Sequence, residues 1–88
     1  MDKIIIKCPK KSLSRKLMGV LKGLKIKWYG NSEISIENNF WEMNTKDTIY
    51  YIDKDKLSYG SFRGLLNEYS SYVLYNVDEF IKKYSKKQ

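Results

Sequence analysis

The chain has 88 residues, of which 42% are hydrophobic and 31% charged, with no histidine and a single cysteine. Its length allows one small hydrophobic core, so we expect a single domain spanning residues 1–88. The composition is too apolar for a disordered chain, and no run approaches the roughly 18 apolar residues of a membrane-spanning helix. One cysteine cannot form an intrachain disulfide and three apolar residues near the start cannot form a signal peptide, so we expect a cytoplasmic protein.

The first third of the chain predicts a strand and then an amphipathic helix. Residues 4–6 are three isoleucines between lysines, and Pro9 then interrupts the strand because it cannot donate to a β-ladder. The helix is expected over residues 12–24, with Ser12 as its N-cap. Its apolar stripe consists of Leu13, Leu17, Val20, Leu21 and Leu24.

The middle of the chain predicts three strands. Residues 26–30 and 33–37 alternate polar and apolar side chains on either side of a Gly-Asn-Ser turn, and we expect them to form a hairpin. Residues 48–52 are rich in β-forming side chains and predict the next strand. The charged residues 53–56 predict a turn after it.

The last third predicts a short helix, a strand and a closing helix. Ser61 is expected to cap a helix over residues 61–69, and residues 72–75 predict a strand. Asn76 and Glu79 have nearly the spacing and chemistry of a capping box, which predicts a helix start. The apolar side chains of that helix are Val77, Phe80, Ile81 and Tyr84.

This order, β-α-β-β-β-α-β-α, is typical of the α+β class. We expect a mainly antiparallel sheet of four to five strands, with the N-terminal amphipathic helix and the C-terminal helix on one face. Residues 82–88 are rich in lysine and are expected to form a frayed basic tail.

The net charge of +7 is unevenly distributed. Residues 1–27 hold nine lysines and arginines against one acid, residues 28–81 hold four against nine acids, and residues 82–88 hold four lysines and no acid. Such a distribution attracts an anionic partner, which could be nucleic acid, a nucleotide or an acidic protein surface. A solvated lysine-rich surface without a function is the alternative.

Basic side chains beside the apolar stripe of the first helix, together with aromatic rings, are the candidate binding groups. Lysine and arginine contact phosphates, and flat rings stack on bases or anchor protein interfaces. Most of the aromatic side chains must fill the core of so small a domain, so only a few remain for a partner. The candidate binding residues are Lys10, Lys11, Arg15, Lys16, Lys22, Tyr29 and Arg63.

No motif for catalysis or metal binding stands out in the sequence. Asp53 and Asp55 begin like a calcium loop, but Leu57 and Ser58 stand where that loop needs a ligand and a glycine. Cys8 lies near lysines that favour a thiolate, yet the chain has no histidine to serve as its base. We therefore predict a protein that is not an enzyme and that uses no cofactor.

Short motifs within residues 17–84 resemble small accessory proteins of phages that infect low-GC Gram-positive bacteria. The amphipathic helix is followed by Lys-Trp-Tyr-Gly at residues 27–30, aromatic strands at residues 48–52 and 57–60, and Asp-Glu-Phe-Ile at residues 78–81. The resemblance implies an inhibitor of host antiviral defence in the bacterial cytoplasm, which binds a defence effector, as anti-CRISPR proteins do, or its nucleotide signal. A small basic nucleic-acid-binding regulator is the alternative. Both allow a homo-oligomer, and neither involves a membrane.

Overall fold

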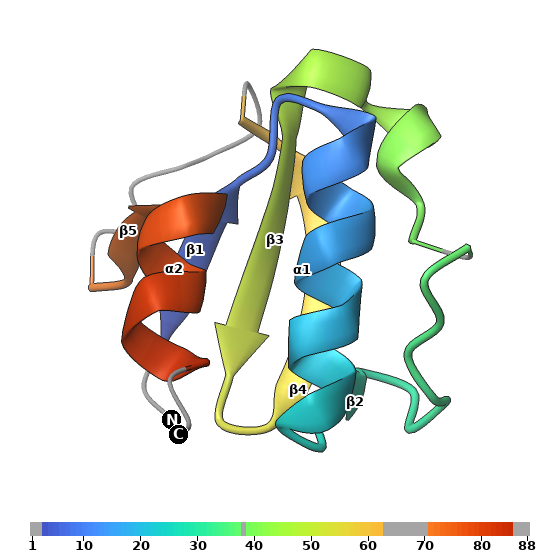
Figure 1. The fold of residues 1–88 in the computed structure, drawn as a ribbon, viewed down its shortest axis with the longest axis vertical. Coiled ribbons are helices and arrows are strands. Elements are labelled where there is room, and N and C mark those ends of the chain that lie inside the picture. Colours follow the sequence, from blue (N-terminus) through green and yellow to red (C-terminus); the bar gives the residue numbers. More distant parts are fainter. Residues whose placement is uncertain (1–2, 38, 63–70, 86–88) are drawn as a thin grey trace.

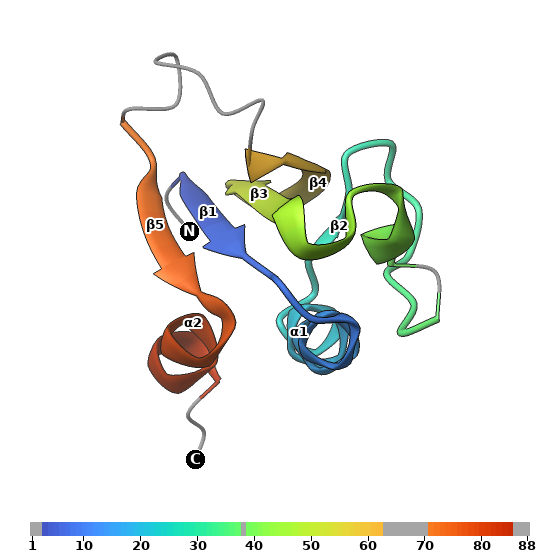
Figure 2. The ribbon, with the colours of Figure 1, turned by 90° about the horizontal axis from the view of Figure 1, so that it is seen from above.

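The computed structural model describes residues 3–37, 39–62 and 71–85, which form one five-stranded sheet with two helices on the same face (Figure 1 and Figure 2). The strands are β1 (Ile4–Lys7), β2 (Lys27–Trp28), β3 (Thr48–Asp53), β4 (Lys56–Ser61) and β5 (Val73–Asn76), and the helices are α1 (Lys11–Gly23) and α2 (Val77–Tyr84). Two short 3₁₀ helices, η1 (Trp41–Met43) and η2 (Thr45–Asp47), precede β3. No helix within the described ranges has the length and apolar character needed to cross a membrane.

The sheet has the strand order β2-β4-β3-β1-β5. The central pairs β1–β3 and β3–β4 are antiparallel, whereas the outer pairs β1–β5 and β2–β4 are parallel. The predicted α+β class, the number of strands and the placement of both helices on one face are therefore confirmed. Most paired residues are antiparallel, as expected, but the sheet is mixed because each edge strand runs parallel to its only neighbour.

The predicted hairpin between residues 26–30 and 33–37 is wrong. The backbone N–H of Asn31 donates to the carbonyl of Trp28 at 2.7 Å, and Asn31 adopts a left-handed φ of 75° that turns the chain. Residues 33–37 then continue as an irregular segment, with Ile34 buried in the core. β2 pairs with β4 instead, through Lys27 opposite Lys56 and Trp28 opposite Leu57.

β4 is absent from the elements predicted in chain order, and only the resemblance to phage accessory proteins placed a strand at residues 57–60. β4 follows β3 through a tight turn in which Lys54 has a φ of 64°. The register places Tyr59 opposite Tyr50 and Leu57 opposite Ile52. Ser61 is the last residue of β4, and most of the helix predicted over residues 61–69 lies outside the described residues.

The apolar stripe of α1 packs on the sheet as predicted, with Leu17 and Leu21 fully buried, and Met18, which was not part of the predicted stripe, is fully buried as well. The predicted N-cap is wrong, because the helix begins one residue before Ser12 and its N-cap is Lys10, whose side chain makes no capping bond. Ser14 is buried, and its hydroxyl donates to the carbonyl of Lys11 at 2.6 Å.

The capping box of α2 is confirmed. The Asn76 side chain accepts a hydrogen bond from the Glu79 N–H at 2.8 Å, and the Asn76 N–H donates to the Glu79 carboxylate at 3.0 Å. Phe80 is fully buried, and Tyr84 packs against it with the ring centroids 4.8 Å apart. Lys82 and Lys83 belong to this helix, while residues 86–88 lie outside the described residues.

Candidate functional site

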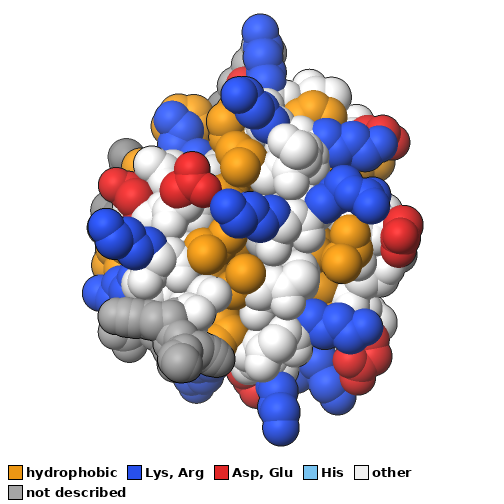
Figure 3. All heavy atoms as spheres, in the orientation of Figure 1, with side chains coloured by type: hydrophobic (Ala, Val, Ile, Leu, Met, Phe, Trp, Pro, Cys, Tyr) orange, Lys and Arg blue, Asp and Glu red, His pale blue; other side chains and the backbone are white. Residues whose placement is uncertain are grey.

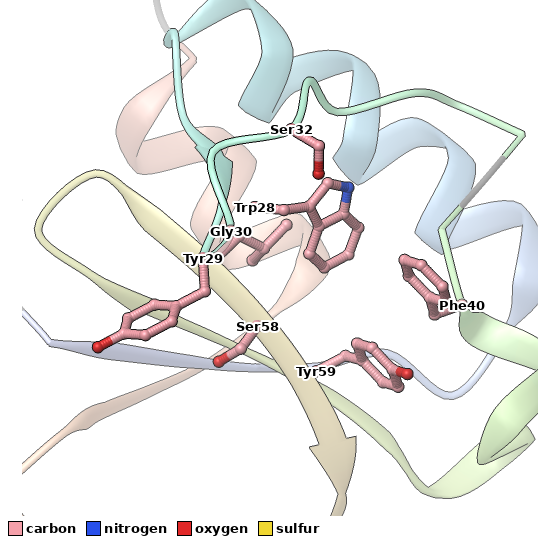
Figure 4. A pocket seen from close by; sticks show the side chains of 8 residues that line it. Trp28, Tyr29, Gly30, Ser32, Phe40, Ser58 and Tyr59 are labelled. Carbon is pink, nitrogen blue, oxygen red and sulfur yellow. The ribbon is translucent and has the colours of Figure 1, made fainter.

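An aromatic cluster stands where β2 meets β4, at one edge of the sheet (Figure 4). The rings of Phe40 and Tyr59 are stacked, with centroids 4.7 Å apart. Trp28 presents an edge-on contact to both rings, at 5.0 Å from Phe40 and 6.1 Å from Tyr59. Offset and edge-on contacts of this kind are the favoured geometries of aromatic pairs.

Three segments far apart in the sequence bring these rings together. The parallel pairing of β2 with β4 fixes Trp28 opposite Leu57, and Tyr59 follows two residues later on the same face. Phe40 arrives from the loop before η1 in a left-handed backbone conformation with a φ of 61°. That conformation costs energy for a residue with a large side chain, so the contacts around it must hold it in place.

Asn39 supplies part of that support. This buried side chain donates to the carbonyl of Ile36 at 2.8 Å and accepts a hydrogen bond from the backbone N–H of Trp41 at 3.0 Å. The buried hydroxyl of Tyr50 donates to the backbone carbonyl of Asn39 at 2.8 Å. The loop is thus fixed on both sides of Phe40, and the ring is positioned before any ligand binds.

The cluster borders a cavity of about 270 Å³. Its lining residues are Trp28, Tyr29, Gly30, Ser32, Phe40, Leu57, Ser58 and Tyr59. We call it the aromatic pocket. Tyr29 stands at its rim with 73% of its surface exposed, and its ring points away from the three packed rings in Figure 4.

Apolar contact and stacking are the interactions that the aromatic pocket offers. Its lining contains flat rings and two serine hydroxyls and, apart from the tyrosine phenols, no group that titrates in water. A flat or apolar group of a ligand fits such a surface, because stacking and burial of apolar area are its main sources of affinity.

The basic candidate residues around α1 do not form one patch. Lys11 pairs with Glu42 of η1, whereas Lys16 lies 3.7 Å from Asp78 of α2. η1 and α2 are on opposite sides of α1, so these two lysines reach in different directions (Figure 1 and Figure 2). Lys11 also holds the pKa of the Glu42 carboxyl below its ordinary value, first by its hydrogen bond and then by its charge.

The other basic candidates are exposed. Arg15 and Lys22 lie four and eleven residues after Lys11, which places all three along one side of α1. Lys10 is the exposed N-cap of the same helix. Acidic side chains lie among the basic ones on the helix-bearing face (Figure 3). Tyr29 belongs to the aromatic pocket and not to this group, and Arg63 lies outside the described residues.

Cys8 is unsuited to nucleophilic chemistry in the folded chain. Its side chain is fully buried, and burial raises the pKa of the thiol from 9.0 to about 12. A backbone hydrogen bond with Lys10 lowers that pKa by less than burial raises it. Within the described ranges, no three Cys, Asp or Glu side chains form a group that could hold a metal ion.

Tyr29 was among the predicted binding residues, whereas Trp28, Phe40 and Tyr59 were not, because most of the aromatic side chains were expected to fill the core. Trp28 is indeed only 8% exposed, so its burial agrees with that expectation. Its contribution to a pocket follows from the β2–β4 pairing, for which the sequence carries no local signal. Comparison of the chain with known protein families, with curated proteins and with solved structures found no significant match.

Proposed function

We propose that this protein is a non-enzymatic inhibitor of host antiviral defence, which acts by stoichiometric binding to a protein effector through its aromatic pocket. One observation carries the binding part of the proposal. An exposed tyrosine borders a rigid pocket formed by three other aromatic rings. Exposed tyrosines next to well-packed apolar pockets are typical anchor points of protein interfaces. The assignment to host defence rests on the resemblance to phage accessory proteins.

The surroundings of the aromatic pocket favour a protein side chain over a nucleotide as its ligand. The basic side chains on β2 and β4, the strands that border the pocket, already have partners, since Lys27 lies 3.6 Å from Glu33 and Lys56 donates to Asn31. A nucleotide needs cations for its phosphates as well as a ring for its base. Binding of the nucleotide signal is therefore the less favoured form of this proposal.

The second candidate function is a nucleic-acid-binding regulator. It is supported by the exposed side of α1 that carries Arg15 and Lys22, for which no ion pair is found among the described residues. Phosphate binding through such groups would weaken steeply and log-linearly with salt, whereas aromatic anchoring would not.

The test is a pull-down from lysate of the bacterial host, with and without nuclease, in which captured proteins and small molecules are identified by mass spectrometry. The captured effector is then titrated with the wild-type protein and with two variants. Tyr29→Ala should weaken binding about tenfold or more, because it removes an interface anchor. Met43→Ala is the matched control, since Met43 is 68% exposed but does not line the aromatic pocket.

We expect inhibition to be complete at a fixed molar ratio of protein to effector. We also expect the effector to be released chemically unaltered. Equal binding by wild type and Tyr29→Ala would contradict the role of the aromatic pocket. Substoichiometric inactivation or a chemically modified effector would show turnover and refute the non-enzymatic proposal. Capture that is lost with nuclease, and weakened by Arg15→Glu with Lys22→Glu, would favour the regulator.

A further inference from the structure

The sheet ends on its other side at β5, the edge opposite the aromatic pocket (Figure 2). The strand sequence Val-Leu-Tyr-Asn contains no charged residue, although charges on an edge strand are a common protection against strand addition. Val73 and Leu74 are 49% and 51% exposed. An uncharged edge with exposed apolar side chains can accept a further strand.

The register shows which backbone groups of β5 face outward. The Val73 N–H donates to the carbonyl of Lys3 at 3.0 Å, and the pair Ile4–Val73 is parallel. In a parallel pair, every second residue directs both its N–H and its C=O to the neighbouring strand. Val73 is such a residue on β5, so the N–H and C=O of the next residue, Leu74, point away from β1, where an added strand could bind them.

Hollows lie beside this edge strand. One, of about 490 Å³, is lined by Leu74, Tyr75, Glu79, Lys82 and Lys83. Another, of about 360 Å³, is lined by Lys7, Pro9, Leu74, Tyr75, Asn76 and Glu79. Successive side chains of an added strand point to opposite faces of the sheet, so space beside the edge strand is what they need.

The charge at this edge selects the partner. Three lysines line the two hollows against one acid, Glu79, and the Glu79 carboxylate already accepts the Asn76 N–H. Lys83 lies over the Tyr75 ring of β5 at 5.9 Å, which positions its ammonium group near the edge. The ammonium group of Lys7 instead lies 4.5 Å from the ring of Phe62, which follows β4. A second copy of this chain would bring the same lysines together, so self-pairing of β5 is disfavoured.

We propose that the outer edge of β5 binds an extended, acidic segment of a partner protein by adding it as a sixth strand. The Leu74 backbone would provide hydrogen bonds, the hollows would take alternate side chains, and Lys82, which lines the larger of the two hollows, would pair with a carboxylate. This interaction does not depend on the aromatic pocket or on the function proposed above.

The probe is a synthetic peptide of about eight residues in which glutamate and valine alternate, compared with its lysine–valine counterpart. Binding is followed by NMR chemical shifts of the backbone amides. We expect the acidic peptide to shift Leu74 and its neighbours on β5, and the basic peptide to leave them unchanged. Equal binding of the two peptides, shifts elsewhere than at β5, or concentration-dependent self-association through β5 would overturn the proposal.

Leu74→Pro is the decisive variant. Proline at this position removes an outward N–H and no bond to β1, and edge strands tolerate proline there. It should weaken peptide binding about tenfold or more, whereas Leu74→Ala, which keeps the N–H, should retain more affinity. Lys82→Glu should also weaken binding, with Lys46→Glu on η2 as its matched control. Unchanged binding to Leu74→Pro would refute strand addition.

If Leu74→Pro does not fold, strand addition is tested instead with an acidic peptide in which alternate backbone amides are N-methylated. It keeps its carboxylates but lacks the N–H donors that an added strand directs to β5. Binding as tight as that of the unmodified peptide would equally refute strand addition.

Discussion

The phenyl ring of Phe40 lies flat on the ring of Tyr59, with the two planes only 3° apart. This contact joins an irregular loop to β4 and requires a left-handed backbone at Phe40, with a φ of 61°. Ring contact and backbone strain therefore act at the same residue, with opposite effects on stability. The pocket is organised before binding, which reduces the entropy that a ligand must overcome.

Phe40→Ala should lower the free energy of unfolding by about 1–3 kcal/mol, because it removes the stacked ring and keeps the strained backbone. Phe40→Gly should be about 1 kcal/mol more stable than Phe40→Ala, since glycine adopts a positive φ without a penalty. Urea unfolding of the three proteins measures both differences. An alanine variant as stable as the glycine variant would show that the backbone at this position is not strained.

Leu17→Asp and Leu21→Asp should each prevent stable folding. Both side chains are fully buried between α1 and the sheet, and a carboxylate there would have no partner in the hydrophobic core that the described residues form. The loss of several kcal/mol is comparable with the whole stability of a domain of this size. Lys22→Asp, at an exposed position of the same helix, is the control and should change the melting temperature by only a few degrees. Cooperative melting of Leu17→Asp near the wild-type temperature would contradict the packing of α1.

Lys10→Asp should stabilise the protein by about 1 kcal/mol. Lys10 occupies the N-cap of α1 with extended dihedral angles, its side chain makes no capping bond, and the first turn contains no acid. Aspartate would accept a hydrogen bond from a free N–H and would interact favourably with the helix dipole. Thermal unfolding measures the gain. Ser12→Ala should have little effect, and a larger loss from Ser12→Ala than the gain from Lys10→Asp would restore Ser12 as the cap.

The stability of the protein should fall as the pH rises above 9. The Cys8 thiol has a pKa of 9.0 when exposed and about 12 when folded, so between these values only the unfolded chain loses its proton. The unfolded state is then favoured by up to about 1.4 kcal/mol for each pH unit. Burial raises the pKa of Tyr50 as well, which adds to the same trend at higher pH.

Urea unfolding of wild type and Cys8→Ala at pH 8, 9 and 10 tests this dependence. The variant lacks the thiol, so its stability should fall less between pH 9 and 10, whatever its stability at pH 8. A thiol reagent should modify wild-type Cys8 only at the rate of unfolding, because the side chain is buried. Parallel pH profiles for the two proteins would show that Cys8 is not the group responsible.

Features that depend on residues three or four positions apart could be predicted from the sequence. The stripe that contains Leu17 and Leu21 determined the buried face of α1, because a helix places these side chains on one side. The capping box of α2 needs only Asn76 and Glu79, which bond to each other's backbone. The β-forming run over residues 48–52 likewise predicted β3, whose side chains fit a buried central strand.

Only the tertiary structure decided which strands pair and which side chains meet. The alternation over residues 33–37 favoured a hairpin, but Asn31 turns the chain and β4 becomes the partner of β2. The residue pattern alone did not predict β4, because its alternation is short and includes Gly60. The aromatic pocket follows from such a long-range pairing. The residue pattern of a segment indicates its own conformation. Which strands and helices it contacts depends on how all segments together bury their apolar surface, so the pattern of one segment cannot predict those contacts.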